Sequence, residues 1–245
     1  MRQFPPEPET DSMYDRYIES GQYPRPNPAT YAAWSSAAKW RMRDWLPRGS
    51  AHRCLDLGSG GGQALYMLRE LGCEDIKGVD VSAECVHCAQ MMNLPVYQAD
   101  AIEWLSNSSE RFDLILAVDL LEHLTNNAVM SLLREAQKHL TDDGVFIGQT
   151  VNGESPMFGQ IRYGDFTHTN AFTQKSLSAL LKQAGFTETR FRPVEPYPHG
   201  LISAARALAW KVLAGGVKAW NFIETGGTGS GIFTRNLIFA ARKRE

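Results

Sequence analysis

The stretch that decides the fold is Cys54-Leu55-Asp56-Leu57-Gly58-Ser59-Gly60-Gly61-Gly62. The residues over 53–57 predict a short buried β-strand, and the apolar spacing over 62–71 predicts a helix directly after the glycines. A glycine-rich turn between a strand and a helix lets the backbone approach a ligand closely, because glycine has no Cβ and tolerates positive φ. We therefore expect a ligand site at the end of this strand.

The rest of the chain alternates between strand and helix patterns, which predicts a parallel sheet with crossover helices. Further strands are expected over 76–79, 96–98, 112–118, 144–150, 188–194 and 232–241. Helices are expected over 83–92, 127–140, 174–184 and 200–223. The fold class is therefore α/β, with a mostly parallel sheet of seven strands and helices on both faces.

Residues 1–48 are rich in proline and aromatic side chains, with helices expected near 12–20 and 30–46. We interpret this segment as an N-terminal helical cap on one domain that spans 49–245. Two insertions interrupt that domain, a long loop over 152–173 and a helix with a glycine-rich turn over 195–231.

The composition is that of an ordinary globular protein, with 43% hydrophobic residues, 21% charged residues and a net charge of −2. Neither sign of charge forms a long run, so we expect a small-molecule partner and no nucleic acid. The chain lacks a transmembrane-length apolar run and a signal-peptide pattern, which favours a cytoplasmic protein with free cysteines. Cys85 and Cys88 have metal-ligand spacing, but no second ligand pair completes a zinc site, so no metal is expected.

Acidic residues end the next two strands along the chain. Asp80 lies in Gly78-Val79-Asp80-Val81-Ser82, and Asp100 lies in Gln98-Ala99-Asp100-Ala101. A carboxylate at the end of the second strand can accept hydrogen bonds from both hydroxyls of a ribose. A glycine turn followed by two acids is the order that one nucleoside needs at the carboxyl edge of a parallel sheet.

The G-x-G-x-G spacing after Asp56 resembles motif I of the class I S-adenosylmethionine-dependent methyltransferases. A dinucleotide fingerprint would instead place glycine or alanine where this chain has Gln63. The string Phe112-Asp113-Leu114-Ile115 with Asp119-Leu120-Leu121-Glu122-His123 is similar to the family's strand beside the donor sulfonium. The resemblance implies a Rossmann-like fold with an antiparallel last strand at the sheet edge, and S-adenosyl-L-methionine as methyl donor. It implies that the donor is bound by Asp56, Gly58, Ser59, Gly60, Asp80, Val81, Asp100, Ala101 and Asp119.

The insertion Tyr163-Gly164-Asp165-Phe166-Thr167-His168 leaves from the same carboxyl edge, where an acceptor would meet it. It resembles a YGDxTHxxAFT block of methyltransferases associated with bacterial surface polysaccharides and other glycans. Asp165 could orient the His168 imidazole while its other nitrogen takes a proton from a hydroxyl, so His168 is the expected base and His123 the second candidate. Alternatively, Asp165 and His168 only hydrogen-bond the loop, and His123 only shapes the pocket.

The expected reaction is O-methyl transfer to a sugar hydroxyl of a glycan or a sugar-containing metabolite. A quinone-like or other small hydroxylated metabolite is the alternative acceptor. Two other classes stay open, a NAD-dependent oxidoreductase and a non-catalytic nucleoside-binding protein. The spacing of Asp119, Glu122 and Asp165 does not single out a magnesium site.

The helix expected over 201–223 is apolar on two faces, with Leu208 and Val212 on one and Trp210 roughly opposite. Its charged residues are Arg206, Lys211 and Lys218. We expect the helix to be covered on both sides, by the cap or in a homodimer interface. Contact with a lipid-linked acceptor or the inner face of a membrane is the alternative. The pair at 215–216, both glycine, is expected to divide the helix into two pieces.

Overall fold

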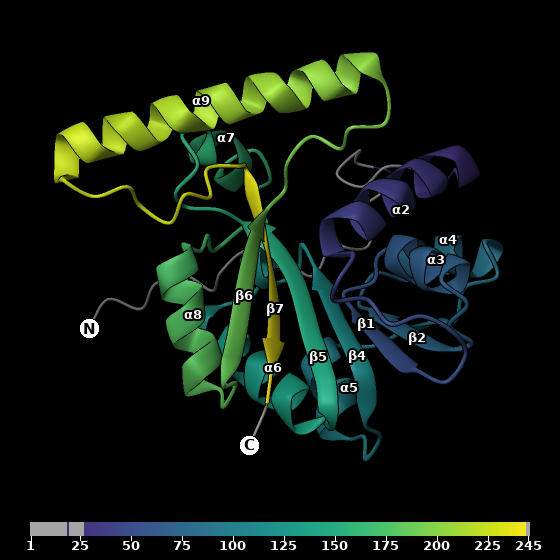
Figure 1. The fold of residues 1–245 in the computed structure, drawn as a ribbon. Coiled ribbons are helices and arrows are strands. Elements are labelled where there is room, and N and C mark those ends of the chain that lie inside the picture. The colour runs from purple at the N-terminus through teal and green to yellow at the C-terminus, as the bar shows by residue number, and fades with distance from the viewer. Residues whose placement is uncertain (1–18, 20–26, 244–245) are drawn as a thin grey trace.

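A seven-stranded sheet forms the centre of the computed structural model, which describes Glu19 and residues 27–243. Apart from Glu19, the helix expected over 12–20 lies outside the described residues. The strand order is β3-β2-β1-β4-β5-β7-β6, with only β7 antiparallel to its neighbours (Figure 1). The strands are β1 Arg53–Leu57, β2 Asp75–Asp80, β3 Val96–Gln98, β4 Phe112–Val118, β5 Leu140–Val151, β6 Glu188–Pro193 and β7 Asn236–Arg242. The predicted α/β class with a mostly parallel sheet is confirmed.

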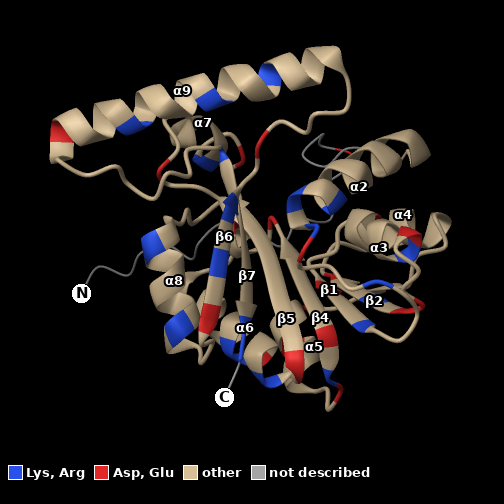
Figure 2. Ribbon diagram, in the orientation of Figure 1, with Lys and Arg blue, Asp and Glu red and all other residues tan. Residues whose placement is uncertain are grey.

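The expectation that the last strand lies at the sheet edge is wrong. β7 lies between β5 and β6, and its residues over 237–241 are all buried. β6 forms the edge instead and carries Glu188, Arg190 and Arg192, visible as its red and blue bands in Figure 2. An apolar run suits a position with neighbours on both sides, whereas charged side chains protect an edge from further pairing.

Helices cover both faces of the sheet (Figure 1). One face is covered by α2 Pro28–Met42, α3 Gln63–Glu70 and α4 Ala83–Met91. The other is covered by α5 Ala101–Ser106, α6 Asn126–Lys138 and α8 Gln174–Gln183. The six-residue α5 was not expected from the sequence, because it is too short to show a helical period. Two further short helices, η1 Leu121–His123 and α7 Phe158–Arg162, lie near the carboxyl ends of the central strands.

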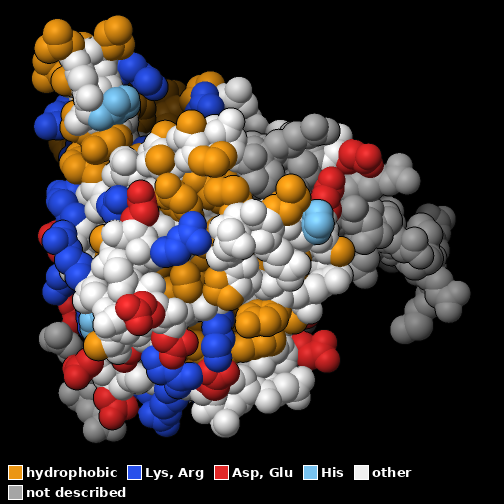
Figure 3. Space-filling model, turned by 90° about the vertical axis from the view of Figure 1, so that its right-hand side faces the viewer, with side chains coloured by type: hydrophobic (Ala, Val, Ile, Leu, Met, Phe, Trp, Pro, Cys, Tyr) orange, Lys and Arg blue, Asp and Glu red, His pale blue; other side chains and the backbone are white. Residues whose placement is uncertain are grey.

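The last helix, α9 Leu201–Thr225, lies across the top of the molecule (Figure 1). It is continuous through Gly215 and Gly216, so the expected division is wrong; a glycine costs a helix only about 1 kcal/mol and does not by itself break it. The expected cover by the cap is also wrong, because Ser203 is the one buried residue of α9 among those described. Cover in a homodimer interface stays a prediction. Figure 3 shows hydrophobic side chains exposed at the top of the molecule, where α9 lies.

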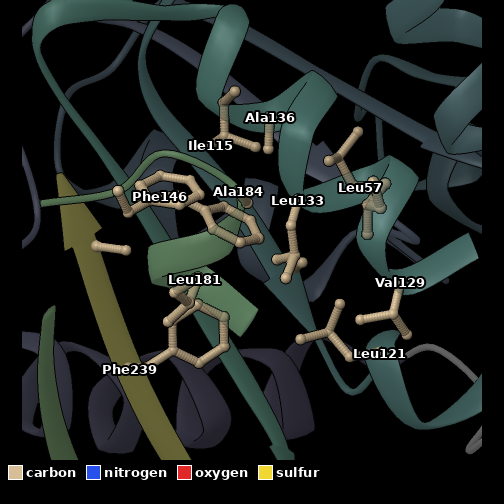
Figure 4. Packing of buried hydrophobic residues seen from close by; sticks show 14 of the residues in the cluster. Leu57, Ile115, Leu121, Val129, Leu133, Ala136, Phe146, Leu181, Ala184 and Phe239 are labelled. Carbon is tan, nitrogen blue, oxygen red and sulfur yellow. The ribbon is translucent and has the colours of Figure 1, made fainter. Parts of the chain in front are cut away.

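Strand alternation divides the core into two hydrophobic clusters. In β4, Leu114 and Leu116 belong to the cluster under α2, α3 and α4, while Ile115 and Ala117 belong to the cluster under α5, α6 and α8. Figure 4 shows the second cluster, in which Phe146 of β5 lies against side chains of the covering helices. With both faces buried, β4 is apolar without interruption from Leu114 to Val118, as parallel central strands are.

Helix α2 packs on the sheet domain through its inward side chains and reaches the glycine turn. The buried Tyr31 hydroxyl donates a hydrogen bond to the Gly61 carbonyl at 2.6 Å. Burial, with Cys88 and Cys85 nearby, raises the pKa of Tyr31 to about 12, so the phenol stays protonated. Ser35 and Lys39 both bond Glu70 of α3. The division between cap and domain at residue 48 stays a prediction, although α2 shares one of the two clusters with α3.

We expect Tyr31→Phe to lower the free energy of unfolding by about 1–3 kcal/mol, because it leaves the buried Gly61 carbonyl without that donor. Urea unfolding measures the change. Tyr163→Phe is the matched control, since this tyrosine is 75% exposed and should shift stability by less than about 0.5 kcal/mol. Equal losses in the two variants would contradict a specific role for the Tyr31 hydroxyl.

Candidate active site

The glycine turn after β1 uses backbone conformations that favour glycine. Gly58, Gly60 and Gly62 have φ values of 64°, 51° and 85°. A Cβ on Gly58 would lie 2.8 Å from Cδ1 of Leu120, so a larger residue would displace the Leu120 side chain in addition to straining the positive φ. Gly62 is the N-cap of α3, and the turn therefore aims the start of this helix at the carboxyl edge of the sheet.

Asp80, at the end of β2, ties the glycine turn to the neighbouring strand. Its Oδ2 accepts a hydrogen bond from Gly60 N at 2.7 Å, and its Oδ1 accepts one from Ser82 N at 2.9 Å. Burial raises the pKa of Asp80, and these two hydrogen bonds oppose the shift. Each carboxylate oxygen has a second lone pair, which leaves acceptor capacity for ligand hydroxyls at this strand end.

Asp56, in β1, has a buried oxygen with no hydrogen-bond partner among the described residues. The side chain is 1% exposed, and the unpartnered atom is Oδ1. Burial, and secondarily the charge of Asp80, raises the pKa of Asp56 well above its ordinary value. An orphaned buried carboxyl oxygen is rare in a native fold and fits a ligand that supplies a hydrogen-bond donor.

The other residues expected at the donor site lie along the same edge in differing environments. Asp100 Oδ1 accepts from Ile102 N and Glu103 N, so it caps α5, and Ala101 is the first residue of that helix. Val81 is exposed directly after β2. Both donors of Ser59, its N and its Oγ, point to the Val79 carbonyl at 3.0 and 3.4 Å. Their roles toward a ligand stay predictions.

Asp119, directly after β4, is held in an unusual conformation. Its φ is 52°, a region that residues other than glycine seldom adopt. Its carboxylate accepts hydrogen bonds from Gln149 Nε2 at 2.9 and 3.0 Å and from Asn236 Nδ2 at 3.0 Å. The side chain remains accessible to solvent, although the surrounding protein raises its pKa. Amides from β5 and β7 thus fix an acid at the point where β4 ends.

The loop over 152–173 is anchored onto η1 by backbone hydrogen bonds. The carbonyl of the buried Glu122 accepts from Thr169 N at 2.7 Å and from Asn170 N at 3.0 Å. Its carboxyl accepts from Thr150 Oγ1 at 2.9 Å, and burial raises the pKa of Glu122 well above its ordinary value. Instead of an open loop throughout, the segment contains α7 and a bridge between Asn152 and Phe172.

The anchored loop brings Asp165 to His123 through Thr167. Asp165 Oδ1 accepts from Thr167 Oγ1 at 2.6 Å, and the same Oγ1 lies 2.9 Å from His123 Nδ1. Because the hydroxyl proton goes to the carboxylate, the hydroxyl oxygen accepts from His123, and Nδ1 carries the proton of the neutral ring. The expected direct pairing of Asp165 with His168 is therefore replaced by a relay to His123.

His168 has a different anchor. Its Nδ1 lies 3.0 Å from the Ile161 carbonyl, which can only accept, so Nδ1 is protonated and Nε2 holds the lone pair of the neutral ring. The rings of His123 and His168 meet edge to face with centroids 4.6 Å apart. A main-chain carbonyl thus fixes the tautomer that Asp165 was expected to fix.

The two ends of the relay, His123 and Asp165, both have pKa values below their ordinary values. Burial and the neighbouring His168 lower the pKa of His123 to about 4, so His123 is uncharged at neutral pH. For Asp165, burial raises the pKa, but the bonds from Thr167 and the nearby histidines outweigh it and leave the pKa below its ordinary value. The relay therefore ends in an ionised carboxylate that holds a neutral imidazole.

Among the residues that the structure describes, no group of three or more His, Cys, Asp or Glu side chains could hold a metal ion.

Sequence analysis missed the residues that position the expected site. Thr167 follows Asp165 by two residues, and the available signal was the tendency of an Asp side chain to bond the backbone two residues on, as Asp165 does with Thr167 N. Gln149 and Asn236 carry no motif, because they reach Asp119 only through the pairing of β4, β5 and β7.

Comparison with known proteins places the chain in a family. A family model described as a methyltransferase domain matches residues 30–190. A ubiquinone biosynthesis O-methyltransferase of Azorhizobium caulinodans is 33% identical over 105 residues, which cover 41% of this chain and 40% of that protein. A protein of the same name from a Methylobacterium species is 27% identical and covers 63% of this chain. The chain spans 40% and 68% of the length of these two curated relatives.

Solved structures share the fold at lower identity. A SAM-dependent methyltransferase of Archaeoglobus fulgidus has a TM-score of 0.63 at 20% identity, over 85% of this chain and 94% of its own. A phosphoethanolamine N-methyltransferase of Haemonchus contortus, solved with S-adenosylhomocysteine, has a TM-score of 0.60 at 17% identity over 95% of this chain and 60% of its own. Because the family model matches residues 30–190 and these structures share the fold, the chain belongs to the methyltransferase domain family.

Proposed function

We propose that the protein transfers a methyl group to a hydroxyl oxygen of a small, quinone-like phenol. The observation that carries this proposal is the geometry of His168: its Nδ1 proton is committed to the Ile161 carbonyl, so in the neutral ring Nε2 holds the lone pair that can accept a proton. A group that accepts a proton beside the acid at the end of β4 suits an acceptor that must lose a proton as it is methylated.

The residues at the carboxyl edge fit the methyl donor. When bound, S-adenosylmethionine supplies an electrophilic methyl group on a sulfonium. Asp80 offers carboxylate lone pairs to the ribose hydroxyls, and Asp56 offers the orphaned oxygen to a hydrogen-bond donor. The glycines of the turn, which adopt positive φ, carry no side chain where the backbone would meet the donor.

His168 is our choice of base, and His123 is the residue beside it. A pKa of about 4 makes His123 a weak proton acceptor at neutral pH. His168 lies half-buried on the loop over 152–173, where the Ile161 carbonyl holds its ring. A phenol, with a pKa near 10, loses its proton to an imidazole more readily than a sugar alcohol does.

The choice of acceptor class follows the named relatives. The curated relatives are named for ubiquinone biosynthesis, which favours a hydroxylated ring over the sugar hydroxyl expected from the sequence. A glycan acceptor rests on the resemblance of the Asp165–His168 block alone. The two classes separate in an assay with methyl-labelled donor, in which we expect transfer to an alkyl catechol and none to a methyl glycoside. Labelling of the glycoside alone would overturn the phenol assignment.

We expect His168→Ala to lower kcat on the phenolic acceptor by about 10²-fold or more, the usual contribution of a general base. The affinity for S-adenosylmethionine, measured by calorimetry, should stay the same, because His168 acts on the acceptor. His87→Ala on the exposed side of α4 is the matched control and should keep full turnover. Unchanged turnover in the His168 variant at saturating donor would rule out His168 as the base.

We expect Asp80→Asn to weaken S-adenosylmethionine binding by about tenfold or more, a loss of about 1.4 kcal/mol or more. The amide nitrogen would face either Gly60 N or Ser82 N, which are both donors, so the variant also loosens the glycine turn. Calorimetric titration measures the dissociation constant, with the exposed Asp143→Asn as control. Equal affinity in the two variants would contradict a donor-binding role for Asp80.

The depressed pKa of His123 predicts a pH-dependent stability difference. Between pH 6.5 and about 4, the unfolded chain binds a proton at this histidine that the folded chain does not bind. Compared with His123→Gln, the wild type should therefore lose stability as the pH falls through that window. Urea unfolding of both proteins at several pH values measures the difference, and His87→Gln should follow the wild type. If the free energies of unfolding of wild type and His123→Gln differ by the same amount at every pH, then the pKa of His123 is equal in the folded and unfolded states, which would contradict the prediction.

A further inference from the structure

Helix α9 touches the body of the protein along one narrow stripe. Its buried or half-buried residues recur at helical spacing: Ser203, Ala207, Trp210, Ala214, Val217 and Asn221. Such spacing marks one face of a helix, so the body covers this face and leaves the opposite one uncovered. The loops at its C-terminal end attach it further, since Glu154 accepts bonds from the N and Oγ of Ser230.

The uncovered face of α9 is apolar from end to end. Leu201 is 92% exposed, Val212 72% and Ile223 83%. The other large apolar residues exposed on the helix are Ile202, Leu208, Leu213, Trp220 and Phe222. The remaining positions on this face are alanine or glycine, so no polar side chain interrupts it. A contiguous apolar surface of this length marks a binding face.

Basic side chains border the apolar face of α9. At the helical angle of 100° per residue, Arg206 falls on one border, and Lys211 and Lys218 fall on the other. Glu224 is the one acid of the helix and stands near its C-terminal end, as the single red band in Figure 2 shows. Figure 3 shows Lys and Arg side chains on both sides of the hydrophobic ones at the top of the molecule.

This arrangement favours an anionic, flat and apolar partner. A second copy paired through the same face would bring three cations of each helix near three of the other, with one acid each to compensate. An apolar face with tryptophan and phenylalanine, bordered by Lys and Arg, is the pattern of a helix that lies in the interface of a bilayer. No helix among the described residues is long and apolar enough to cross a membrane.

We propose that the outer face of α9 binds the surface of an anionic lipid bilayer, with the helix lying in the plane of the interface. The loop over 152–173, which contains α7, is joined to the segment after α9, because Glu154 accepts hydrogen bonds from the N and Oγ of Ser230. In the view of Figure 1, α7 is drawn below α9. That loop exposes Met157, Tyr163 and Phe166. If the proposed function holds, docking through α9 brings the acceptor loop to the lipid boundary, where a lipid-soluble phenol would reach it.

Flotation of the full chain with vesicles tests the proposal without donor or acceptor, so its result does not depend on the proposed function. We expect the wild type to float with vesicles of equal parts phosphatidylcholine and phosphatidylglycerol, and to bind phosphatidylcholine vesicles much more weakly. Val212→Glu should lower the fraction of protein bound to vesicles by about tenfold, because it places a charge on the face of α9 that would enter the lipid. Met91→Glu on α4 is the matched control, since Met91 is also 72% exposed, and it should float as the wild type does.

A second variant separates the electrostatic contribution. Arg206→Glu combined with Lys211→Glu should abolish the preference for anionic over neutral vesicles. Far-ultraviolet circular dichroism and cooperative urea unfolding verify that each variant keeps its fold. A wild type that fails to float, or a Val212→Glu variant that floats equally well, would overturn the proposal. A wild-type dimer in light scattering that does not float and that Val212→Glu converts to monomer would assign the face to a second copy instead.

Discussion

The hydrogen bond from Gly60 N to Asp80 Oδ2, 2.7 Å long, is the contact on which the donor side of the site depends. It fixes a turn whose positive φ values glycine adopts easily and other residues adopt only at a cost. It also joins the ends of β1 and β2. Tyr31 holds the same turn from the opposite side through the Gly61 carbonyl. The turn is therefore fixed before any ligand binds, which lowers the ordering cost of binding.

The acceptor side that we propose depends on a second junction, at the buried Glu122. Its carboxyl is bonded to Thr150 of β5, and its carbonyl receives the backbone of the loop over 152–173. Because that loop carries Thr167 and His168, the position of Glu122 determines where both histidines meet. Rigid placement of this kind matters more than the strength of any one bond, since proximity and orientation supply much of the rate of a displacement.

The sequence predicted the parts of the fold that local patterns encode. The strand before the glycines and the acids at strand ends are local signals, and the structure has both at the carboxyl edge of the sheet. The pairing of Asp165 with Thr167 and His123 depends on a contact 44 residues apart, which spacing cannot show. The exposure of α9 could likewise not be predicted from the spacing of its apolar residues. A helix with apolar residues on two faces has the same sequence pattern whether protein or lipid covers it.

Three acids near the site, Asp56, Asp80 and Glu122, have pKa values raised chiefly by burial. An acid whose folded pKa is raised contributes stability that is lost as the pH rises through that value, so ionising these groups destabilises the free protein. In the proposed function, the sulfonium of the methyl donor would favour the ionised form of the acids nearest to it, because a nearby positive charge stabilises a carboxylate. Under that proposal, a cationic donor bound at this edge would offset part of the cost of ionising these buried acids.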